Sequence, residues 1–308
     1  MYMYIKILSA LYGQGNTWAD VKNILDMKIV DNHINIIVNN DLFGDPSPYN
    51  MKQLKVKYNL SGDIQKRIIN EHKRFITDIF NVGSLEDILK VISENKNGVE
   101  IGGPSFPRGT KILYQNANNF DNVVWSNDTV WYKQQDKYNF STGKSGKIII
   151  NDATNISSVK DKTYDFIFSS HCLEHIANPL KAVKEWIRIV KDNGFIIIIV
   201  PEKSRCFDHK RKYSKFNTLL SQYEKNVNED DLSTLNEILK FHDLPMDIGA
   251  PQHPDKFKKR CLNNFYNRCL HHYVYDDNLL LEICNYFKCE HIYKITQGIN
   301  RWFIMKKV

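Results

Sequence analysis

The chain has 308 residues, about twice the usual size of one domain, so it can form two folded units or one catalytic domain with large additions. Hydrophobic residues make up 42% of the sequence and charged residues 25%, an ordinary globular composition that excludes a disordered chain. The net charge is +7, from 42 Lys and Arg against 35 Asp and Glu, and it is spread along the chain. We therefore expect no nucleic-acid partner.

The sequence shows no sign of a membrane span or of export. Its longest apolar run, residues 195–201, is far shorter than the roughly 20 residues that cross a bilayer. The first residues carry one basic side chain, Lys6, and no long apolar stretch, which argues against a secretory signal. The six cysteines form no CxxC pair and no cluster with zinc-site spacing. These features predict a cytoplasmic protein with reduced thiols.

Residues 1–60 are expected to form a small, β-rich α+β domain. Strands are predicted at residues 1–11, 33–38 and 54–58 from their composition and alternation, and a helix is predicted at residues 17–27 from its apolar spacing. This accessory domain carries no evident chemistry.

Two helices are expected next, at residues 64–80 and 85–93, because helix-starting signals precede charged segments there. From residue 99 onward, short apolar runs alternate with helical segments, the pattern of a parallel sheet with helices on both faces. The predicted strands are residues 99–101, 123–125, 147–150, 165–169 and 195–200, followed by a helix at 278–287 and closing strands at 289–296 and 300–306. The fold class is therefore α/β, with a Rossmann-like core over residues 61–201 that residues 271–308 complete.

Residues 202–270 interrupt this pattern with helical segments rich in Asn, Lys and Leu. An insertion after the fifth strand lies at the carboxyl edge of the sheet, where α/β folds bind ligands. We therefore interpret residues 202–270 as a helical substrate lid. Its first part, residues 203–215, is the most basic stretch of the chain, which is typical of an anion site and also of a solvated loop.

Three segments of the core carry candidate chemistry. The first strand ends in Glu100 and a glycine pair, Gly102-Gly103, which lets the backbone approach a ligand closely. Another strand ends in Asp152. The fourth strand leads into Ser169-Ser170-His171-Cys172-Leu173-Glu174-His175, followed by a helix and a loop that contains glycine.

With these motifs, residues 99–201 resemble the class I S-adenosylmethionine-dependent methyltransferases, whose fourth and fifth strands bracket a Leu-Glu-His turn, a helix and a glycine-containing loop. The chain is similar in particular to a bacterial subgroup linked to surface-polysaccharide biosynthesis. The segments that carry this likeness are residues 100–105, 169–175, 207–211 and 269–272.

The resemblance implies S-adenosyl-L-methionine as the cofactor. Glu100 and the backbone of Gly102 and Gly103 would face its methionine part, and Asp152 with Ala153 would lie at the adenine.

Two further cofactor contacts are expected. Ser170, at the end of the fourth strand, belongs to the same segment as the Leu-Glu-His turn. The acid that usually binds the ribose after the second strand is displaced here, and Asp128 is the nearest carboxylate, with Asn127 as its substitute. The same displacement and the absence of a full GxGxxG motif disfavour an NAD site.

A hydroxyl acceptor must lose its proton during methyl transfer, and a histidine is a natural base near neutral pH. His171, at the end of the fourth strand, is the first candidate for the catalytic base, and His175 is the second. Alternatively, His175 braces the turn and Glu174 orients it. His171, Glu174, His175 and Asp208 could converge on a metal ion, but spacing alone does not establish such a site and no metal is predicted.

In the lid, Asp208, His209, Arg211 and His272 are expected to bind the substrate. Asp208 and His209 could act as a base, contact a phosphate or a sugar, or lie on a solvated turn. His271 and His272 are adjacent and point apart if the backbone is extended, so only one of them should face the site.

These expectations describe an O-methyltransferase that acts on a small polar, sugar, nucleotide-sugar or phosphorylated acceptor in capsule or O-antigen polysaccharide biosynthesis. The alternative is a non-catalytic binding or scaffold protein that docks a partner through its N-terminal domain. Residues 11–58 resemble a small domain at the end of some J-domain co-chaperones, which implies a protein partner. An RNA or protein methyltransferase is disfavoured because Ser169-Ser170-His171-Cys172 replaces an amide-recognition motif after the fourth strand.

Overall fold

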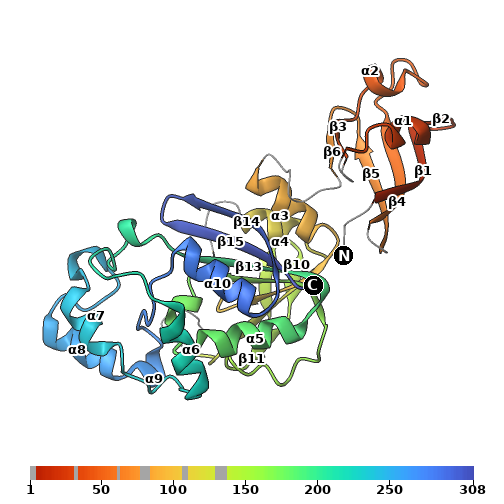
Figure 1. The fold of residues 1–308 in the computed structure, drawn as a ribbon. Helices are drawn as coiled ribbons and strands as arrows, with labels where there is room; N and C mark the ends of the chain where they lie inside the picture. The colour runs from red at the N-terminus through yellow and green to blue at the C-terminus, as the bar shows by residue number, and fades with distance from the viewer. Residues whose placement is uncertain (1–4, 31–33, 61–62, 77–83, 106–109, 129–136) are drawn as a thin grey trace. The chain divides into compact units, whose positions relative to one another are not determined.

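The structure is a computed structural model of residues 1–308. It describes all of them except residues 1–4, 31–33, 61–62, 77–83, 106–109 and 129–136 (Figure 1). The chain divides into two compact units, Met1–Ser84 and Leu85–Val308. Among the described residues, no helix has both the length and the apolar character needed to cross a bilayer.

The first unit is built on an antiparallel sheet. In spatial order its strands are β2 (Thr17–Asp20), β1 (Ile5–Gln14), β4 (Gln53–Leu60) and β5 (Asp63–Asn70). A second pair joins β3 (Asn35–Ile37) to β6 (Arg74–Ile76), and two short helices are α1 (Lys22–Asp26) and α2 (Asn40–Phe43). Apolar side chains from these elements, among them Ile7, Leu25 and Leu54, form a core of their own.

Two predictions for this unit are wrong. Residues 64–76 form β5 and β6 in place of a helix, and residues 77–80 of that predicted helix lie outside the described residues. The isoleucines at 64 and 68 fit a helical spacing, but they also share one face of a strand, and β5 pairs along its whole length with β4. The predicted helix at 17–27 is β2 followed by α1. The first unit therefore ends at Ser84 and not at residue 60.

The second unit contains a seven-stranded sheet in the order β11-β8-β7-β12-β13-β15-β14. Its strands are β7 (Asn97–Ile101), β8 (Asn119–Val124), β11 (Ile148–Ile150), β12 (Tyr164–Ser170), β13 (Val190–Pro201), β14 (Glu290–Gln297) and β15 (Asn300–Lys306). The first five in spatial order are parallel, and β15 and β14 are antiparallel to their neighbours. The predicted α/β class and Rossmann-like sheet are confirmed.

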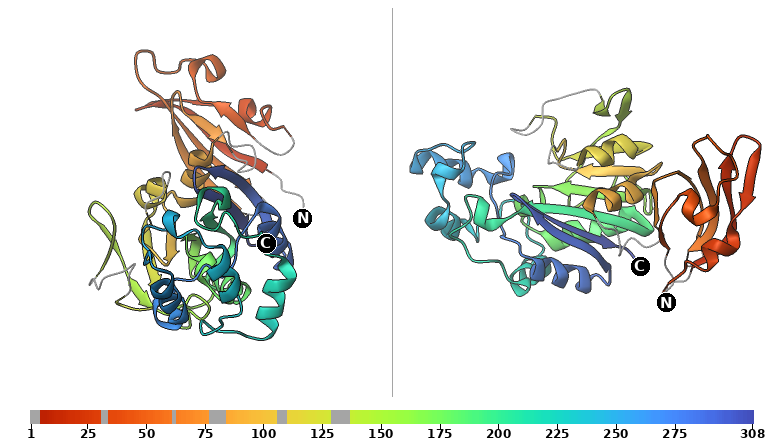
Figure 2. Two further views of the ribbon diagram at one scale, coloured as in Figure 1. Left: turned by 90° about the vertical axis from the view of Figure 1, so that its left-hand side faces the viewer. Right: turned by 90° about the horizontal axis from the view of Figure 1, so that it is seen from above.

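Helices cover both faces of this sheet (Figure 2). On one side lie α3 (Leu85–Ser93) and α4 (Thr110–Asn116), and on the other α5 (Pro179–Ile189), α6 (Phe216–Glu224) and α10 (Asp277–Tyr286). Helix α5 begins where Asn178 accepts a hydrogen bond from the Lys181 amide and Pro179 occupies the first turn. Its apolar stripe, including Val183 and Trp186, is buried in the main core.

A helical insertion separates β13 from α10 (Figure 1). Besides α6 it contains η2 (Lys203–Arg205), α7 (Leu235–Phe241), η3 (Leu244–Met246), α8 (Pro254–Leu262) and α9 (Asn264–Asn267). Side chains from α7, α8 and the following segment, such as Ile238, Phe257 and Leu270, form a small separate core. A hairpin of β9 (Tyr138–Ser141) and β10 (Lys144–Gly146) was not expected from the sequence.

Candidate active site

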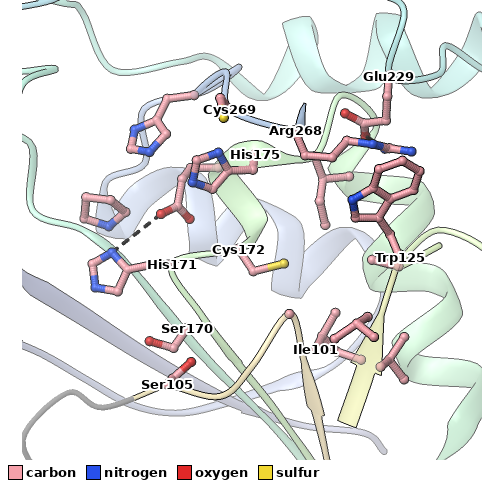
Figure 3. Close-up of a pocket in the computed structure, with 18 of the residues that line it drawn as sticks. Ile101, Ser105, Trp125, Ser170, His171, Cys172, His175, Glu229, Arg268 and Cys269 are labelled. Carbon is pink, nitrogen blue, oxygen red and sulfur yellow. Dashed lines mark ion pairs between the residues drawn. The ribbon is translucent and has the colours of Figure 1, made fainter. Parts of the chain in front are cut away.

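A cavity of about 630 Å³ opens at the carboxyl ends of β7, β8, β11 and β12. The chain enters the sheet at β7, builds outward through β8 and β11, and then crosses back to β12 beside β7. Such a reversal leaves a crevice between the two central strands, the usual place for a ligand in this class of sheet. The insertion supplies the facing wall, through residues such as Phe207, Glu229 and Arg268 (Figure 3).

Gly102 forms part of the cavity wall just after β7. Its φ is +82°, a left-handed conformation that favours glycine, and its amide donates a 2.8 Å hydrogen bond to the Val123 carbonyl. A Cβ on Gly102 would lie 2.9 Å from the Cys172 sulfur. The turn therefore keeps space open that any other residue would fill.

Glu100 does not line the cavity, contrary to the prediction that it faces the cofactor. Its carboxyl is fully buried and accepts hydrogen bonds from the phenols of Tyr114 and Tyr138. Burial raises the pKa of Glu100 to about 7, although hydrogen bonds from Ser105 and the two tyrosines oppose the shift. A Cβ on Gly103 would lie 2.1 Å from this carboxyl. Glu100 therefore packs beneath the glycine turn and supports it.

Asp152 and Ala153, which are expected at the adenine, line the cavity beyond β11. Asp152 is held by Arg268 of the insertion, whose guanidinium lies 3.2 Å from its carboxylate and 3.3 Å from that of Glu229. The same guanidinium lies over the ring of Trp125, which lines the cavity directly after β8 (Figure 3). Arg268 thus joins the insertion to the sheet edge.

The expected ribose-binding acid is not at the cavity. Asp128 is exposed and does not belong to the lining residues. Trp125 stands at the end of that strand, with its indole nitrogen buried and without a hydrogen-bond partner among the described residues. Trp125 was not predicted as a site residue because the sequence was searched for a carboxylate. An aromatic residue directly after a buried strand was the sequence feature that could have indicated it.

His171 lies at the end of β12, and Ser170 precedes it in the wall. The His171 φ is +48°, an uncommon conformation for a residue with a side chain. Its Nε2 lies 2.7 Å from the Asn300 amide oxygen, and its Nδ1 lies 3.6 Å from the Glu174 carboxylate (Figure 3). Burial alone would lower the pKa of His171, but the interactions with Glu174 and Asn300 outweigh it and raise the pKa.

His175 and His271 meet across the cavity, one from the turn after β12 and the other from the insertion. Their ring centres are 4.5 Å apart and their planes are nearly perpendicular. Burial, together with the charge of nearby His271, lowers the pKa of His175 to about 3, so its imidazole is neutral at pH 7. Glu174, in the same turn as His175, is 1% exposed. Its pKa is lowered because the surrounding histidines outweigh burial.

None of the four residues predicted to bind substrate in the lid lines the cavity. Asp208 and Arg211 are buried and form an ion pair at 3.0 Å. Arg211 also donates to the carbonyls of His271 and His272, at 2.7 and 3.1 Å. His209 pairs instead with Asp243, at 2.8 Å. These side chains satisfy one another inside the insertion.

The prediction for the adjacent histidines chose the wrong member. His271 lines the cavity, whereas His272 is buried behind it with its Nε2 3.2 Å from the Asn264 amide nitrogen. The reasoning that neighbours in an extended segment point to opposite sides was sound, but it does not say which side faces the sheet. The lid residues that sequence reasoning missed at the cavity include Phe207, Glu229, Asp247, Arg260 and Cys269.

Residues 78–246, more than half of the chain, match a protein family described as a methyltransferase domain. The chain is similar to a SAM-dependent methyltransferase from Aquifex aeolicus, with 14% identity, a TM-score of 0.40 and coverage of 72% of this chain and 89% of that chain. It is similar to the PH0226 protein from Pyrococcus horikoshii OT3, with 14% identity, a TM-score of 0.40 and coverage of 75% and 94%. It is also similar to the N-methyltransferase NodS from Bradyrhizobium japonicum WM9, with 9% identity, a TM-score of 0.36 and coverage of 72% and 93%. No curated protein matches the chain.

The cavity fits S-adenosylmethionine, the methyl donor of this family. Its volume lies within the range of about 300–1,000 Å³ that small-molecule sites occupy. The turn at Gly102 leaves a cradle that a Cβ would fill, and the Ser170 hydroxyl and the Trp125 indole nitrogen are buried without hydrogen-bond partners among the described residues. A bound ligand would supply those partners. The chain belongs to the methyltransferase-domain family.

Proposed function

We propose that the protein transfers a methyl group from S-adenosylmethionine to a hydroxyl oxygen of a small polar acceptor, a sugar or a phosphorylated compound. The acceptor oxygen forms a bond to the methyl carbon while the carbon–sulfur bond breaks. The sulfur keeps the electron pair and the product is S-adenosylhomocysteine. The hydroxyl proton passes to a base, for which we propose His171.

The observation that carries this proposal is the set of ionisable side chains on the cavity wall opposite the glycine turn. Asp247, Arg260 and His271 come from the insertion and face the cavity with His171. The Arg260 Nη1 is buried and donates no hydrogen bond to a described residue, and it lies 3.6 Å from the Asp247 carboxylate. A guanidinium nitrogen with a spare donor at the cavity wall suits a phosphate or a sugar hydroxyl far better than an apolar acceptor.

Contacts with two side chains support the proposed role of His171 in proton transfer. The contacts of Nε2 with Asn300 and of Nδ1 with Glu174 fix the orientation of its ring. A fixed base beside the acceptor contributes roughly 10²–10⁴-fold to a rate. His175, the second candidate for the base, is more deeply buried, and its low pKa makes it a weak proton acceptor at neutral pH.

The test is transfer from methyl-labelled S-adenosylmethionine to a panel of nucleotide sugars, sugar phosphates, amines and carbon acids, followed by mass spectrometry of the products. We expect methyl ethers of sugar or phosphorylated acceptors. The His171→Asn variant should lose roughly 100-fold or more in rate, whereas His253→Asn, at an exposed position outside the cavity, should keep it. Methylation of amines or carbon acids alone would overturn the proposal.

We place this reaction in surface-polysaccharide biosynthesis, in the cytoplasm. The likeness of residues 100–105, 169–175, 207–211 and 269–272 to the polysaccharide-linked subgroup supports the pathway. All six cysteines are free, which supports a reducing compartment.

For the first unit we propose a protein-docking role. Strand β5 lies at the edge of its sheet, and Ile64 and Ile68 are 58% and 63% exposed on it. An edge strand with exposed apolar side chains can pair with an extended peptide of a partner. A labelled peptide of alternating apolar residues should bind the full chain. The Ile68→Lys variant should abolish this binding, whereas Met51→Lys, at a position of similar exposure outside β5, should not. Equal binding by both variants would refute the role.

A further inference from the structure

We propose that Glu174, His175 and His271 bind a divalent transition-metal ion inside the cavity. One ligand atom from each of these three residues lies within 4.8 Å of the other two. The three come from two separate parts of the chain, the turn after β12 and the segment after α9. This inference goes beyond methyl transfer and does not depend on which acceptor is used.

The donor set indicates the class of metal. Two imidazole nitrogens and one carboxylate oxygen suit zinc and its neighbours in the first transition row, whereas magnesium prefers oxygen ligands and keeps several waters. Three protein ligands leave a further coordination position, and the three residues line the cavity. That position would therefore face the space that the acceptor occupies, where the metal would act as a Lewis acid.

The environment of Glu174 is an independent reason to expect a cation. The side chain is 1% exposed, and neither carboxylate oxygen accepts a hydrogen bond from a described residue. The His171 Nδ1 lies 3.6 Å from this carboxylate, beyond hydrogen-bond distance. A metal ion would give these two buried oxygens the partner that they lack among the described residues.

Asp208 and Arg211 provide the outer support that histidine ligands usually have. The Asp208 carboxylate lies 2.6 Å from the Nδ1 of His271, so it holds the proton on that nitrogen and leaves the lone pair of Nε2 for a metal. Arg211, 1% exposed, fixes Asp208 in turn. Support of a metal ligand would explain why Asp208 and Arg211 are buried although neither lines the cavity.

The test is direct metal binding to the full chain, prepared without a histidine tag and stripped with a chelator. Cobalt(II) should bind with a stoichiometry near one and give visible bands of nitrogen and oxygen ligation, and zinc should displace it. Glu174→Gln and His271→Ala should each weaken binding by more than the roughly 10- to 100-fold expected for a supporting residue, and Asp208→Asn should weaken it by about that amount. His253→Ala is the matched control, since His253 is exposed and does not line the cavity.

Circular dichroism melts of each variant show whether it is folded, and calorimetry with S-adenosylmethionine separates this inference from the proposed function. Folded wild type that binds the cofactor but no cobalt or zinc would overturn the metal site alone. So would metal binding that Glu174→Gln and His271→Ala leave unchanged. A strong thiolate-to-cobalt charge-transfer band would also overturn it, because it would assign the ion to Cys172 or Cys269, which line the same cavity.

Discussion

The guanidinium carbon of Arg268 lies 4.5 Å from the centre of the Trp125 ring, so a residue of the insertion stacks on the residue that ends β8. Arg268 also ion-pairs with Asp152, one of the predicted cofactor contacts. Trp125 and Asp152 therefore lie on one side of the cavity, and the insertion covers it. Trp125, and not Asp128, lies at the cavity where the sequence led us to expect a ribose-binding acid.

We predict that Trp125→Ala weakens S-adenosylmethionine binding roughly tenfold or more, because stacking of a base on an aromatic ring contributes about 1–3 kcal/mol. Isothermal titration calorimetry measures the effect. Trp18→Ala, which removes an indole of the first unit, serves as the control and should bind the cofactor like wild type. Unchanged affinity in Trp125→Ala would show that the indole does not contact the cofactor.

The turn at Gly102 gives a second prediction, with a closely matched control. Gly102 and Gly143 both have positive φ, +82° and +72°, so alanine strains the backbone at either position by about 1–2 kcal/mol. Only at Gly102 would the new Cβ meet another atom, the Cys172 sulfur at 2.9 Å. Gly102→Ala should therefore lose cofactor binding in calorimetry, whereas Gly143→Ala should lose stability alone. Equal affinities would place the cofactor away from this turn.

Glu100 predicts a pH dependence of stability. Because burial raises its pKa from 4.5 to about 7, the folded protein holds this proton more tightly than the unfolded chain does. The resulting stabilisation is complete below about pH 4.5 and is lost as the pH rises through 7, by on the order of 3 kcal/mol. Glu100→Gln cannot lose the proton, so the variant should be more stable than wild type at pH 8.

Urea unfolding of the cofactor-free protein between pH 4.5 and 8 measures this difference. Glu86→Gln, an exposed substitution at the start of α3, is the control and should follow wild type at every pH. If wild type and Glu100→Gln showed parallel pH profiles, the Glu100 carboxyl would have to titrate near its ordinary pKa.

The main sheet was predictable because buried parallel strands leave a local signature. The run Phe195–Val200 is continuously apolar, and it forms the part of β13 that pairs with both β12 and β15. Helix α3 was predicted with its observed bounds because charges at its start and an amphipathic stripe agree. The strand β5 was missed because its identity depends on pairing with β4, and the spacing of its isoleucines satisfies a helix equally well.

The site was predictable only in its sheet half. Gly102, Asp152, Ala153, Ser170, His171 and His175 line the cavity because each follows a strand end, a position that topology fixes. The lid half failed because its contacts are made between residues far apart in the chain. Asp208 contacts His271, which lies 63 positions later in the sequence. No local sequence pattern shows that the Asp208 carboxylate pairs inside the insertion and does not face the cavity.

A substitution of Arg211 tests whether the buried lid residues are structural and do not bind the substrate. Its guanidinium donates to the carbonyls of His271 and His272 and to Asp208 from a site that is 1% exposed, so it ties the start of the insertion to its end. Lysine keeps the charge but cannot make these divergent hydrogen bonds. Each buried carbonyl that loses its donor costs about 1–3 kcal/mol. Arg211→Lys should therefore loosen the segment that carries His271.

Hydrogen exchange at the His272 amide, which donates to the Glu174 carbonyl at 2.8 Å, reports this loosening. We expect exchange there to accelerate by at least 100-fold in Arg211→Lys, because a loss of about 3 kcal/mol from the two carbonyls together corresponds to more than two factors of ten. Lys210→Ala, whose ammonium is half exposed and pairs with Asp243, should leave that amide unchanged. If the His272 amide of Arg211→Lys exchanged as slowly as in wild type while the KM for the acceptor rose, Arg211 would instead be a substrate contact.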